Sequence, residues 1–243
     1  MRIAAIIQAR MGSTRLPGKV LADLAGQPML ARVVNRTARA KTLDKVVVAT
    51  TTDSADAVIA DLCAQNCWPF FRGDRDDVLD RYCQAAKAHG AEVVVRITSD
   101  CPFIDPEIID RVVRVFLEKN PDYASNTLKR TYPRGLDVEV VTLVSLIRAC
   151  HECSDPYQRV HVTPYICQNP HLFQIISVTS EADYSDHRWT VDTPEDLEFA
   201  RAVYLQLSDK DAFTWRDVLN ILAEEPALKK INRYTQQKSI REG

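Results

Sequence analysis

Short apolar runs alternate with amphipathic stretches over the first half of the chain. The apolar runs are rich in β-branched or aromatic residues and predict buried parallel strands. They cover residues 2–8, 45–51, 68–72 and 92–98. The amphipathic stretches carry apolar residues at helical spacing. They predict helices over residues 28–40, 54–66, 76–90 and 106–120.

Residues at the ends of these stretches support the assignment. Ser54 is placed to cap the second helix, and Gly90 is placed to end the third. Pro106, followed by Glu107, is typical of a first helical turn. The alternation predicts an α/β fold, a Rossmann-like and mostly parallel sheet with helices on both faces. A ligand should then bind beyond the carboxyl ends of the strands, in a nucleotide-binding half formed by residues 1–120.

The pattern changes after residue 120. Strand-like runs follow one another there without regular helices between each pair, at residues 122–126, 135–142, 172–178 and 187–192. We interpret residues 121–192, the acceptor segment, as a smaller inserted mixed-sheet portion that binds the second substrate and contributes a dimer contact. Helices over residues 194–207 and 214–225 are expected to close a single domain spanning residues 1–225. Residues 226–243 are predicted to be a polar, frayed tail.

Composition narrows the class of protein. The chain has 243 residues, enough for a sizeable core, and its formal net charge is −2. That charge argues against a dedicated nucleic-acid binder. The start "MRIAAIIQ" does not resemble a signal peptide, which predicts a cytoplasmic protein with reduced thiols, and its apolar run is too short to span a membrane. Cys150 and Cys153 have the spacing of half a zinc site but lack a second pair, so we interpret them as a helix-end thiol pair.

The loop after the first strand, residues 9–19, gathers glycines and cations; we call it the opening loop. Gly12 and Gly18 allow the backbone to approach an anion, while Arg10, Arg15 and Lys19 supply positive charge. Loops at this place in an α/β fold bind phosphates. The spacing matches neither the Walker A nor the dinucleotide-binding pattern. It favours a phosphate site over an irregular solvated loop with scattered cations.

Two aspartates follow strand-like runs that lie far apart in the chain. Asp100 comes after residues 92–98, and Asp192 ends the run "RWTVD". Two carboxylates at neighbouring strand ends can share a Mg²⁺ ion, which takes a few carboxylates together with phosphate oxygens. For Asp192 the alternative is a helix cap ahead of "TPED". Cys101 beside Asp100 has no partner specified for nucleophilic chemistry and is interpreted as packing.

Several of these stretches resemble a known family in order and at natural spacing. They include "QARMGSTRLPGKVLADLAGQPML" (8–30), "VVVATTTDSAD" (46–56), "FRGDRDDVLDRY" (71–82), "RITSDCPFIDPEIID" (96–110), "YPRGLDVEVV" (132–141) and "RWTVDTPEDLEFAR" (188–201). The chain resembles the nucleotidyltransferases that activate sugars with CTP, of the SpsF type related to the CMP-Kdo and CMP-acylneuraminate synthetases. The resemblance covers about residues 1–205. It implies the fold of nucleotide-diphospho-sugar transferases.

The resemblance also implies roles for individual residues. Asp100 and Asp192 match the family's Mg²⁺ ligands, and with Arg10 and Lys19 they form the expected catalytic set. The expected nucleotide contacts are Ala9, Arg10, Met11, Gly12, Arg15, Lys19, Arg72, Gly73, Thr98 and Ser99. Related enzymes often carry Gln-Gly where this chain has Thr98-Ser99. That departure weakens the assignment of residues to the cytosine base.

The acceptor pocket is expected in the acceptor segment. Its predicted contacts are Arg134, Asp137, Glu139, Arg159 and His161. Asp137 and Glu139 alternate onto one strand face, and Arg134 can pair with an anionic group of the acceptor. An edge hairpin with ordinary charges is the alternative. The family usually has Glu where this chain has Val160, and a lone histidine such as His161 is more often structural than catalytic.

Together these features predict a cytidylyltransferase that transfers CMP from CTP to a sugar-type acceptor, a 2-keto-sugar acid or a sugar phosphate. Pyrophosphate is released, Mg²⁺ is the cofactor, and the product serves surface polysaccharide or modified-sugar biosynthesis. We expect a homodimer with no nucleic-acid or membrane partner. The alternatives are a nucleotidyltransferase that uses another nucleoside triphosphate and an inactive nucleotide-binding protein of the same fold. A glycosyltransferase would more usually show an Asp-x-Asp motif after a strand.

Overall fold

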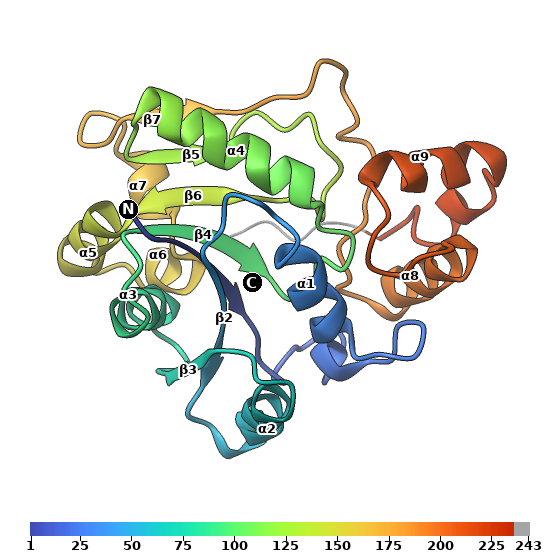
Figure 1. Ribbon diagram of the computed structural model, residues 1–243, viewed down its shortest axis with the longest axis horizontal. Coiled ribbons are helices and arrows are strands. Elements are labelled where there is room, and N and C mark those ends of the chain that lie inside the picture. The colour runs from blue at the N-terminus through green and yellow to red at the C-terminus, as the bar shows by residue number, and fades with distance from the viewer. Residues whose placement is uncertain (236–243) are drawn as a thin grey trace.

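The computed structural model describes residues 1–235, which form one seven-stranded sheet in the order β3-β2-β1-β4-β6-β5-β7 (Figure 1). The first four strands are mutually parallel, as predicted: β1 (Ile3–Gln8), β2 (Lys45–Thr51), β3 (Phe70–Gly73) and β4 (Val93–Thr98). β6 (Glu139–Thr142) runs antiparallel to both β4 and β5 (Tyr123–Ser125). β7 (Ile175–Ser177) pairs parallel to β5. The mixed portion therefore extends the same sheet.

Helices cover both faces of this sheet. One face packs against α1 (Met29–Thr37), α2 (Ala57–Gln65) and α4 (Pro106–Lys119), and the same core cluster extends to α8 (Pro194–Gln206) and α9 (Trp215–Glu224) at the side of the sheet (Figure 1). The other packs against α3 (Val78–Ala88), α5 (Leu143–Glu152), α6 (Pro156–His161) and α7 (Pro164–Gln168). Residues 1–235 also contain the short 3₁₀ helices η1 (Lys19–Leu21), η2 (Ser54–Asp56) and η3 (Leu228–Lys230).

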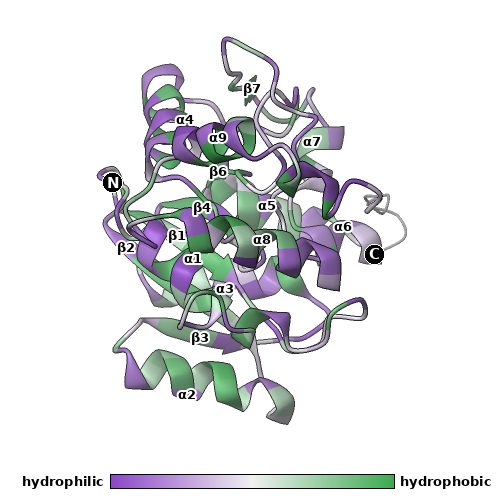
Figure 2. Cartoon of the chain, turned by 90° about the vertical axis from the view of Figure 1, so that its right-hand side faces the viewer, coloured by the Kyte–Doolittle hydropathy of each residue, from purple (hydrophilic) through white to green (hydrophobic). Residues whose placement is uncertain are grey.

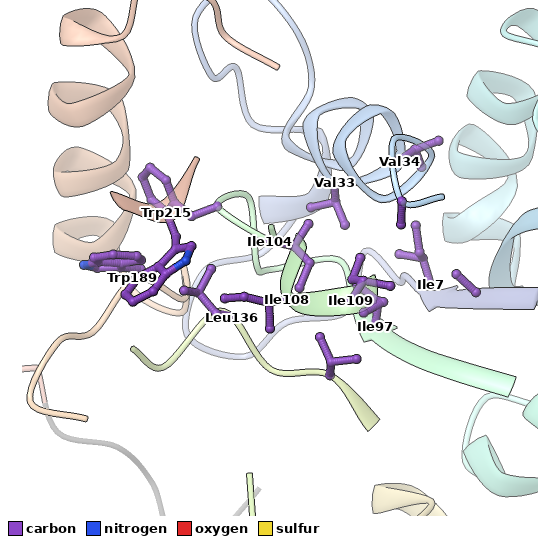
Figure 3. Close-up of a cluster of buried hydrophobic side chains, with 14 of the residues drawn as sticks. Ile7, Val33, Val34, Ile97, Ile104, Ile108, Ile109, Leu136, Trp189 and Trp215 are labelled. Atoms are coloured by element: carbon purple, nitrogen blue, oxygen red, sulfur yellow. The ribbon is translucent and has the colours of Figure 1, made fainter. Parts of the chain in front are cut away.

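Strand alternation divides the core into two clusters. On β1, Ile3, Ala5 and Ile7 face the layer of α1 and α4, whereas Ala4 and Ile6 face the layer of α3 and α5. Figure 3 shows Ile7 and the β4 residue Ile97 against side chains from α1 and α4. Hydrophobic residues gather on the central strands, and the helices carry both kinds of residue (Figure 2). This core holds the carboxyl ends of β1 and β4 side by side.

The first half of the chain confirms the sequence prediction, with one corrected cap. α2 begins at Ala57, after η2, and Ser54 makes no side-chain capping hydrogen bond. The Asp56 carboxylate, at the N-cap of α2, is instead occupied by the backbone N–H of Met11 at 2.6 Å and by the Thr51 hydroxyl. The start of α2 thus anchors the opening loop.

The acceptor segment corrects two predictions. Helices α5, α6 and α7 lie between β6 and β7, where no regular helices were expected; α6 and α7 each have proline in the first turn. Residues 187–192 do not form a strand and make only an isolated bridge between Arg188 and Arg134. Their backbone bonds to turns instead, with the Val191 N–H donating to the Asp100 carbonyl at 2.8 Å. That bond brings Asp192 next to Asp100.

The start of the predicted tail is also packed. Asn232 is only 6% exposed and donates its side-chain N–H groups to the Asp196 carboxylate at 2.9 Å and the Arg188 carbonyl at 3.1 Å. Frayed structure is therefore wrong for this part, because a buried amide holds it to α8. Residues 236–243 lie outside the described part. Within residues 1–235, the helices are all too short or too polar to cross a membrane.

Candidate active site

The opening loop curls over the carboxyl end of β1. The Ala9 N–H donates to the Ala49 carbonyl at 3.1 Å, which extends the pairing of β1 with β2. Gly18 has a φ of +71°, a left-handed conformation that glycine adopts without strain, and its N–H donates to the Met11 carbonyl at 3.0 Å. This closed turn points the Lys19 side chain back toward the sheet.

Lys19 lies between the two predicted metal ligands. Its Nζ is 2.8 Å from Asp100 Oδ2 and 2.9 Å from Asp192 Oδ1, and it donates to the Val191 carbonyl at 2.8 Å. Lys19 is 9% exposed. The structure therefore brings Lys19 of the opening loop together with both predicted metal ligands.

Asp192 is held by two further cations. Arg15 Nη2 lies 2.9 Å from Asp192 Oδ1, and Arg188 Nη2 lies 2.9 Å from Asp192 Oδ2. Arg188 also pairs with Asp196, which is fully buried and accepts the Asp192 backbone N–H at 3.0 Å. Asp196 thereby fixes both the backbone and the charged partner of Asp192.

These contacts shift the protonation equilibria of the central group. Burial by itself lowers the pKa of Lys19, but the negative charges of Asp100 and Asp192 outweigh it and raise that pKa. Burial raises the pKa of Asp100, but the Lys19 charge and hydrogen bond lower it to about 2. Lys19 is therefore a cation and Asp100 a carboxylate at neutral pH.

The two carboxylates fit a Mg²⁺ ion. A single ammonium already contacts both, which shows that their oxygens converge on one cation position. Residues 1–235 contain no group of three or more His, Cys, Asp or Glu side chains able to hold a metal. A pair of carboxylates suits Mg²⁺, which usually keeps waters and adds substrate phosphate oxygens.

Arg10 and Gly12 lie on the outer side of the opening loop. Arg10 is exposed, and its side chain makes no hydrogen bond or ion pair with the rest of residues 1–235. A Cβ on Gly12 would have only Arg75 Nη2 nearby, at 4.0 Å. This part of the loop is open to a ligand.

The residues predicted near the base are more constrained. Arg72 donates to the Thr51 carbonyl at 2.8 Å and the Asp53 carbonyl at 2.9 Å, so its guanidinium holds the loop after β2. Gly73 packs tightly, since a Cβ there would lie 3.0 Å from the Arg81 side chain. Thr98 ends β4 and Ser99 follows it beside the opening loop, where the Ser99 N–H donates to the Gln8 carbonyl at 3.2 Å.

Cys101 completes the turn after β4. Its Sγ lies 3.2 Å from the Thr98 hydroxyl, and burial raises the pKa of its thiol. A buried neutral thiol agrees with its interpretation as packing.

Arg134 approaches the same site from the acceptor segment. Its half-buried guanidinium makes no ion pair or side-chain hydrogen bond within residues 1–235, and burial lowers its pKa, an effect that the nearby charges of Arg130 and Arg188 reinforce. Asp137 is bound by both ends of the Arg130 guanidinium, at 2.6 and 2.9 Å. Arg134 is therefore the unpaired cation on this side of the site.

Among the other predicted acceptor residues, Glu139 forms its hydrogen bonds and ion pair with groups inside the protein. Glu139 is 7% exposed and accepts from Arg96, from the Tyr123 hydroxyl at 2.8 Å and from the Thr163 hydroxyl at 2.6 Å. Asp137 precedes β6, and Glu139, the first residue of β6, points into this buried network.

Arg159 and His161 lie on α6. Arg159 pairs with Asp77, the N-cap of α3, and donates to the last carbonyls of α5. His161 stacks near Tyr157, with ring centroids 5.0 Å apart. The structure gives Arg159 a helix-joining role and does not bring it to Asp100.

The sequence and the structure agree with one family of proteins. A family model described as cytidylyltransferase matches residues 4–240. The chain belongs to the cytidylyltransferase family. Its fold is that of the nucleotide-diphospho-sugar transferases, as predicted.

Three relatives illustrate the match. The spore coat polysaccharide biosynthesis protein SpsF of Bacillus subtilis is 34% identical over 229 residues, 91% of this chain and 94% of SpsF. The 3-deoxy-manno-octulosonate cytidylyltransferase of Geobacter sulfurreducens is 39% identical over 148 residues, 60% of this chain and 58% of that protein. A solved cytidylyltransferase structure from Leptospira borgpetersenii has a TM-score of 0.91 at 33% identity, covering 98% of this chain and 99% of that one.

Some residues of this cytidylyltransferase site escaped the sequence analysis. Asp56, Arg188 and Asp196 position the opening loop and Asp192, and Asn232 supports Asp196 from the tail. Asp196 had a usable signal, because Thr193 and Asp196 form a capping box at the start of α8. Val160, which replaces the expected Glu, packs half-buried against the core cluster that contains α3.

Proposed function

We propose that this protein transfers CMP from CTP to a sugar-type acceptor and releases pyrophosphate. The observation that carries the proposal is the Lys19 ammonium bound between Asp100 and Asp192, directly beneath the opening loop. That arrangement combines a phosphate-binding cation with a two-carboxylate metal position. Membership of the cytidylyltransferase family supports CTP as the nucleotide.

The proposed reaction is a phosphoryl transfer in which the site stabilises negative charge. An acceptor oxygen attacks the α-phosphorus of CTP, the bond from that phosphorus to the bridging oxygen breaks, and pyrophosphate leaves with the bonding electrons. Negative charge on the phosphoryl oxygens would be stabilised by Arg10, Arg15 and Lys19. Mg²⁺ held by Asp100 and Asp192 would screen the triphosphate and polarise the reacting phosphoryl group. No covalent enzyme intermediate is needed.

The acceptor should carry an anionic group. Arg134 is an unpaired, half-buried cation close to the charges of Asp192 and Arg188. A carboxylate or phosphate on the acceptor would complete its pairing. A 2-keto-sugar acid or a sugar phosphate meets this requirement, in keeping with relatives described as SpsF and as 3-deoxy-manno-octulosonate cytidylyltransferase. Surface-polysaccharide or modified-sugar synthesis in the cytoplasm, by a homodimer, belongs to the same proposal.

Thermal unfolding with Mg²⁺ tests the nucleotide. CTP, UTP, GTP and ATP are compared at equal concentration, and a ligand at about a hundred times its dissociation constant adds about 2.7 kcal/mol of stability. We expect a shift for CTP. A shift for another nucleotide alone would assign a different base, and no shift for any would refute the triphosphate site.

Pyrophosphate release then tests the reaction. 3-Deoxy-manno-octulosonate and a panel of sugar phosphates serve as acceptors. Asp100→Asn should lower the rate about a thousandfold or more, since the metal position loses a charge. Asp61→Asn, at an exposed position on α2, makes the same chemical change away from the site and should keep the wild-type rate. Equal rates for the two variants would contradict the proposed metal site.

A further inference from the structure

The cations and carboxylates of the site neutralise one another in the free protein. A lysine ammonium has three N–H donors, and those of Lys19 are all taken, by Asp100, Asp192 and the Val191 carbonyl. In this arrangement Lys19 has no donor left for a phosphate oxygen. A role for Lys19 in phosphate binding therefore requires it to leave the carboxylates.

The Asp192 carboxylate has several cationic partners, whereas the cation that contacts Asp100 within residues 1–235 is Lys19. Asp192 Oδ1 contacts both Lys19 and Arg15 at 2.9 Å, and Asp192 Oδ2 contacts Arg188 at 2.9 Å. A metal ion that binds Asp192 must displace at least one of these cations. Two cations cannot share the small space between Asp100 and Asp192 without strong repulsion.

We propose that Lys19 holds the place of the metal ion in the free protein, and that Mg²⁺ and the nucleotide triphosphate exchange partners with it in one coupled step. The inference rests on the proposed function. The metal takes over Asp100 and Asp192 while Lys19 moves onto the triphosphate, and Arg15 can make the same move from Asp192. No covalent bond changes.

The local structure suits such an exchange. Gly18 sets the backbone just before Lys19, and η1 follows directly, so the main chain is held in place. The four-carbon stem of lysine can swing its ammonium without moving that backbone. The freed charge then meets the phosphates that arrive with the metal.

The exchange makes a thermodynamic prediction. Metal alone must compete with an internal ammonium, and triphosphate alone finds Lys19 engaged, so each ligand binds weakly without the other. Because binding free energies are reciprocal, each ligand must tighten the other by the same factor. Removing the ammonium should strengthen metal binding alone and weaken this coupling.

Mn²⁺, followed by its electron paramagnetic resonance signal, reports bound metal without any turnover. The first measurement uses no nucleotide and compares wild type with Lys19→Met. The control is Lys119→Met, which removes the same charge from the exposed end of α4. We expect Lys19→Met to bind Mn²⁺ about tenfold more tightly than wild type, which is about 1.4 kcal/mol. Lys119→Met should match wild type.

Mn²⁺ affinity that is unchanged or weaker in Lys19→Met would overturn the place-holder role. Should that variant fail to fold, Lys19→Gln removes the charge but keeps an amide donor for the carboxylates. The second measurement adds CTP, which should tighten Mn²⁺ about tenfold or more in wild type and clearly less in the Lys19 variant. Equal tightening in both, or none in wild type, would overturn the coupling. The thermal shift with CTP tests the proposed function separately.

Discussion

The opening loop and the acceptor segment both bring charged residues to the carboxyl edge of the sheet, but their charges have different partners. Within residues 1–235, Arg10 of the opening loop forms no ion pair, and the ion pairs of Arg15 and Lys19 are made with Asp100 and Asp192. Those partners are the residues that a metal would take. The contacts of the opening loop are therefore exchangeable on ligand binding.

Most charged side chains named in the acceptor segment form ion pairs or hydrogen bonds that stabilise the fold. Glu139 is enclosed by Arg96, Tyr123 and Thr163, and Asp137 is bound by Arg130. Breaking such pairs leaves a buried charge without a partner. The comparison shows that a charge near a site serves a ligand only when the fold leaves it free or gives it a partner that the ligand can replace. Arg134 meets this condition, and so does Asp192 at the end of the segment, whose partners Lys19 and Arg15 a ligand can replace.

The largest effect expected from this comparison concerns Glu139. Glu139→Gln should lower the free energy of unfolding by about 3–5 kcal/mol, because it leaves the Arg96 guanidinium, whose side chain is 14% exposed, without its counter-charge. Urea denaturation measures this loss. Asp137→Asn, which removes a carboxylate from a more exposed ion pair, is the matched variant and should cost about 1 kcal/mol. A stable Glu139→Gln protein with a raised KM for the acceptor would place Glu139 in the pocket and break the distinction.

Gly135 in the acceptor segment and Gly12 in the opening loop extend the comparison to the space around the backbone. Gly135 has a φ of +106°, and a Cβ there would lie 2.6 Å from the Thr190 backbone nitrogen. Gly135→Ala should therefore cost about 2–4 kcal/mol, combining overpacking with backbone strain. Gly12→Ala meets nothing closer than 4.0 Å and should change stability by less than about 0.5 kcal/mol.

Thermal and urea unfolding of the two alanine variants give these values. Gly12→Ala should still weaken CTP binding, since the added methyl group lies where the loop backbone would approach the phosphates. A destabilised Gly12→Ala protein, or a Gly135→Ala protein as stable as wild type, would show that the two regions do not differ in this way.

The parallel half of the fold could be predicted because its signals are local. Apolar runs and helical periodicity mark β1 to β4 and α1 to α4, and Pro106 starts α4 as expected. Residues 187–192 have the composition of a strand but lie extended against the turns at Arg134 and Asp100. Only the tertiary structure decides between these outcomes. Helices α6 and α7 are short, with 6 and 5 residues, which leaves little room for a helical periodicity to show in the sequence.

Part of the candidate site could also be predicted, because some of its residues carry local sequence signals. Asp100 and Asp192 could be named because each ends an apolar run, and Lys19 because it closes a glycine-rich loop. That Lys19 contacts both aspartates depends on the pairing of β1 with β4 and on the bond from Val191 to Asp100. Side-chain partners such as Arg96 for Glu139 join residues far apart in sequence. Sequence patterns carry no record of which charges are already satisfied.

The smallest expected effect concerns Arg134, and it decides whether the acceptor segment contributes to binding of the acceptor. Arg134→Met keeps the apolar stem and removes the charge, so stability should stay within about 0.5 kcal/mol of wild type. The KM for an anionic acceptor should rise about 10- to 100-fold, the equivalent of one lost charge-assisted hydrogen-bonded pair of about 1.5–3 kcal/mol. The KM for CTP should change little. Steady-state pyrophosphate release with each substrate varied in turn measures both constants.

Arg114→Met on the exposed side of α4 is the matched control for the loss of an arginine charge. It should leave both KM values unchanged. If Arg134→Met instead raised the KM for CTP and left that for the acceptor unchanged, Arg134 would belong with the opening loop as a phosphate-binding cation. Apart from Asp192, the acceptor segment would then supply only packing to this edge of the sheet, because Asp137, Glu139 and Arg159 already have partners within the fold.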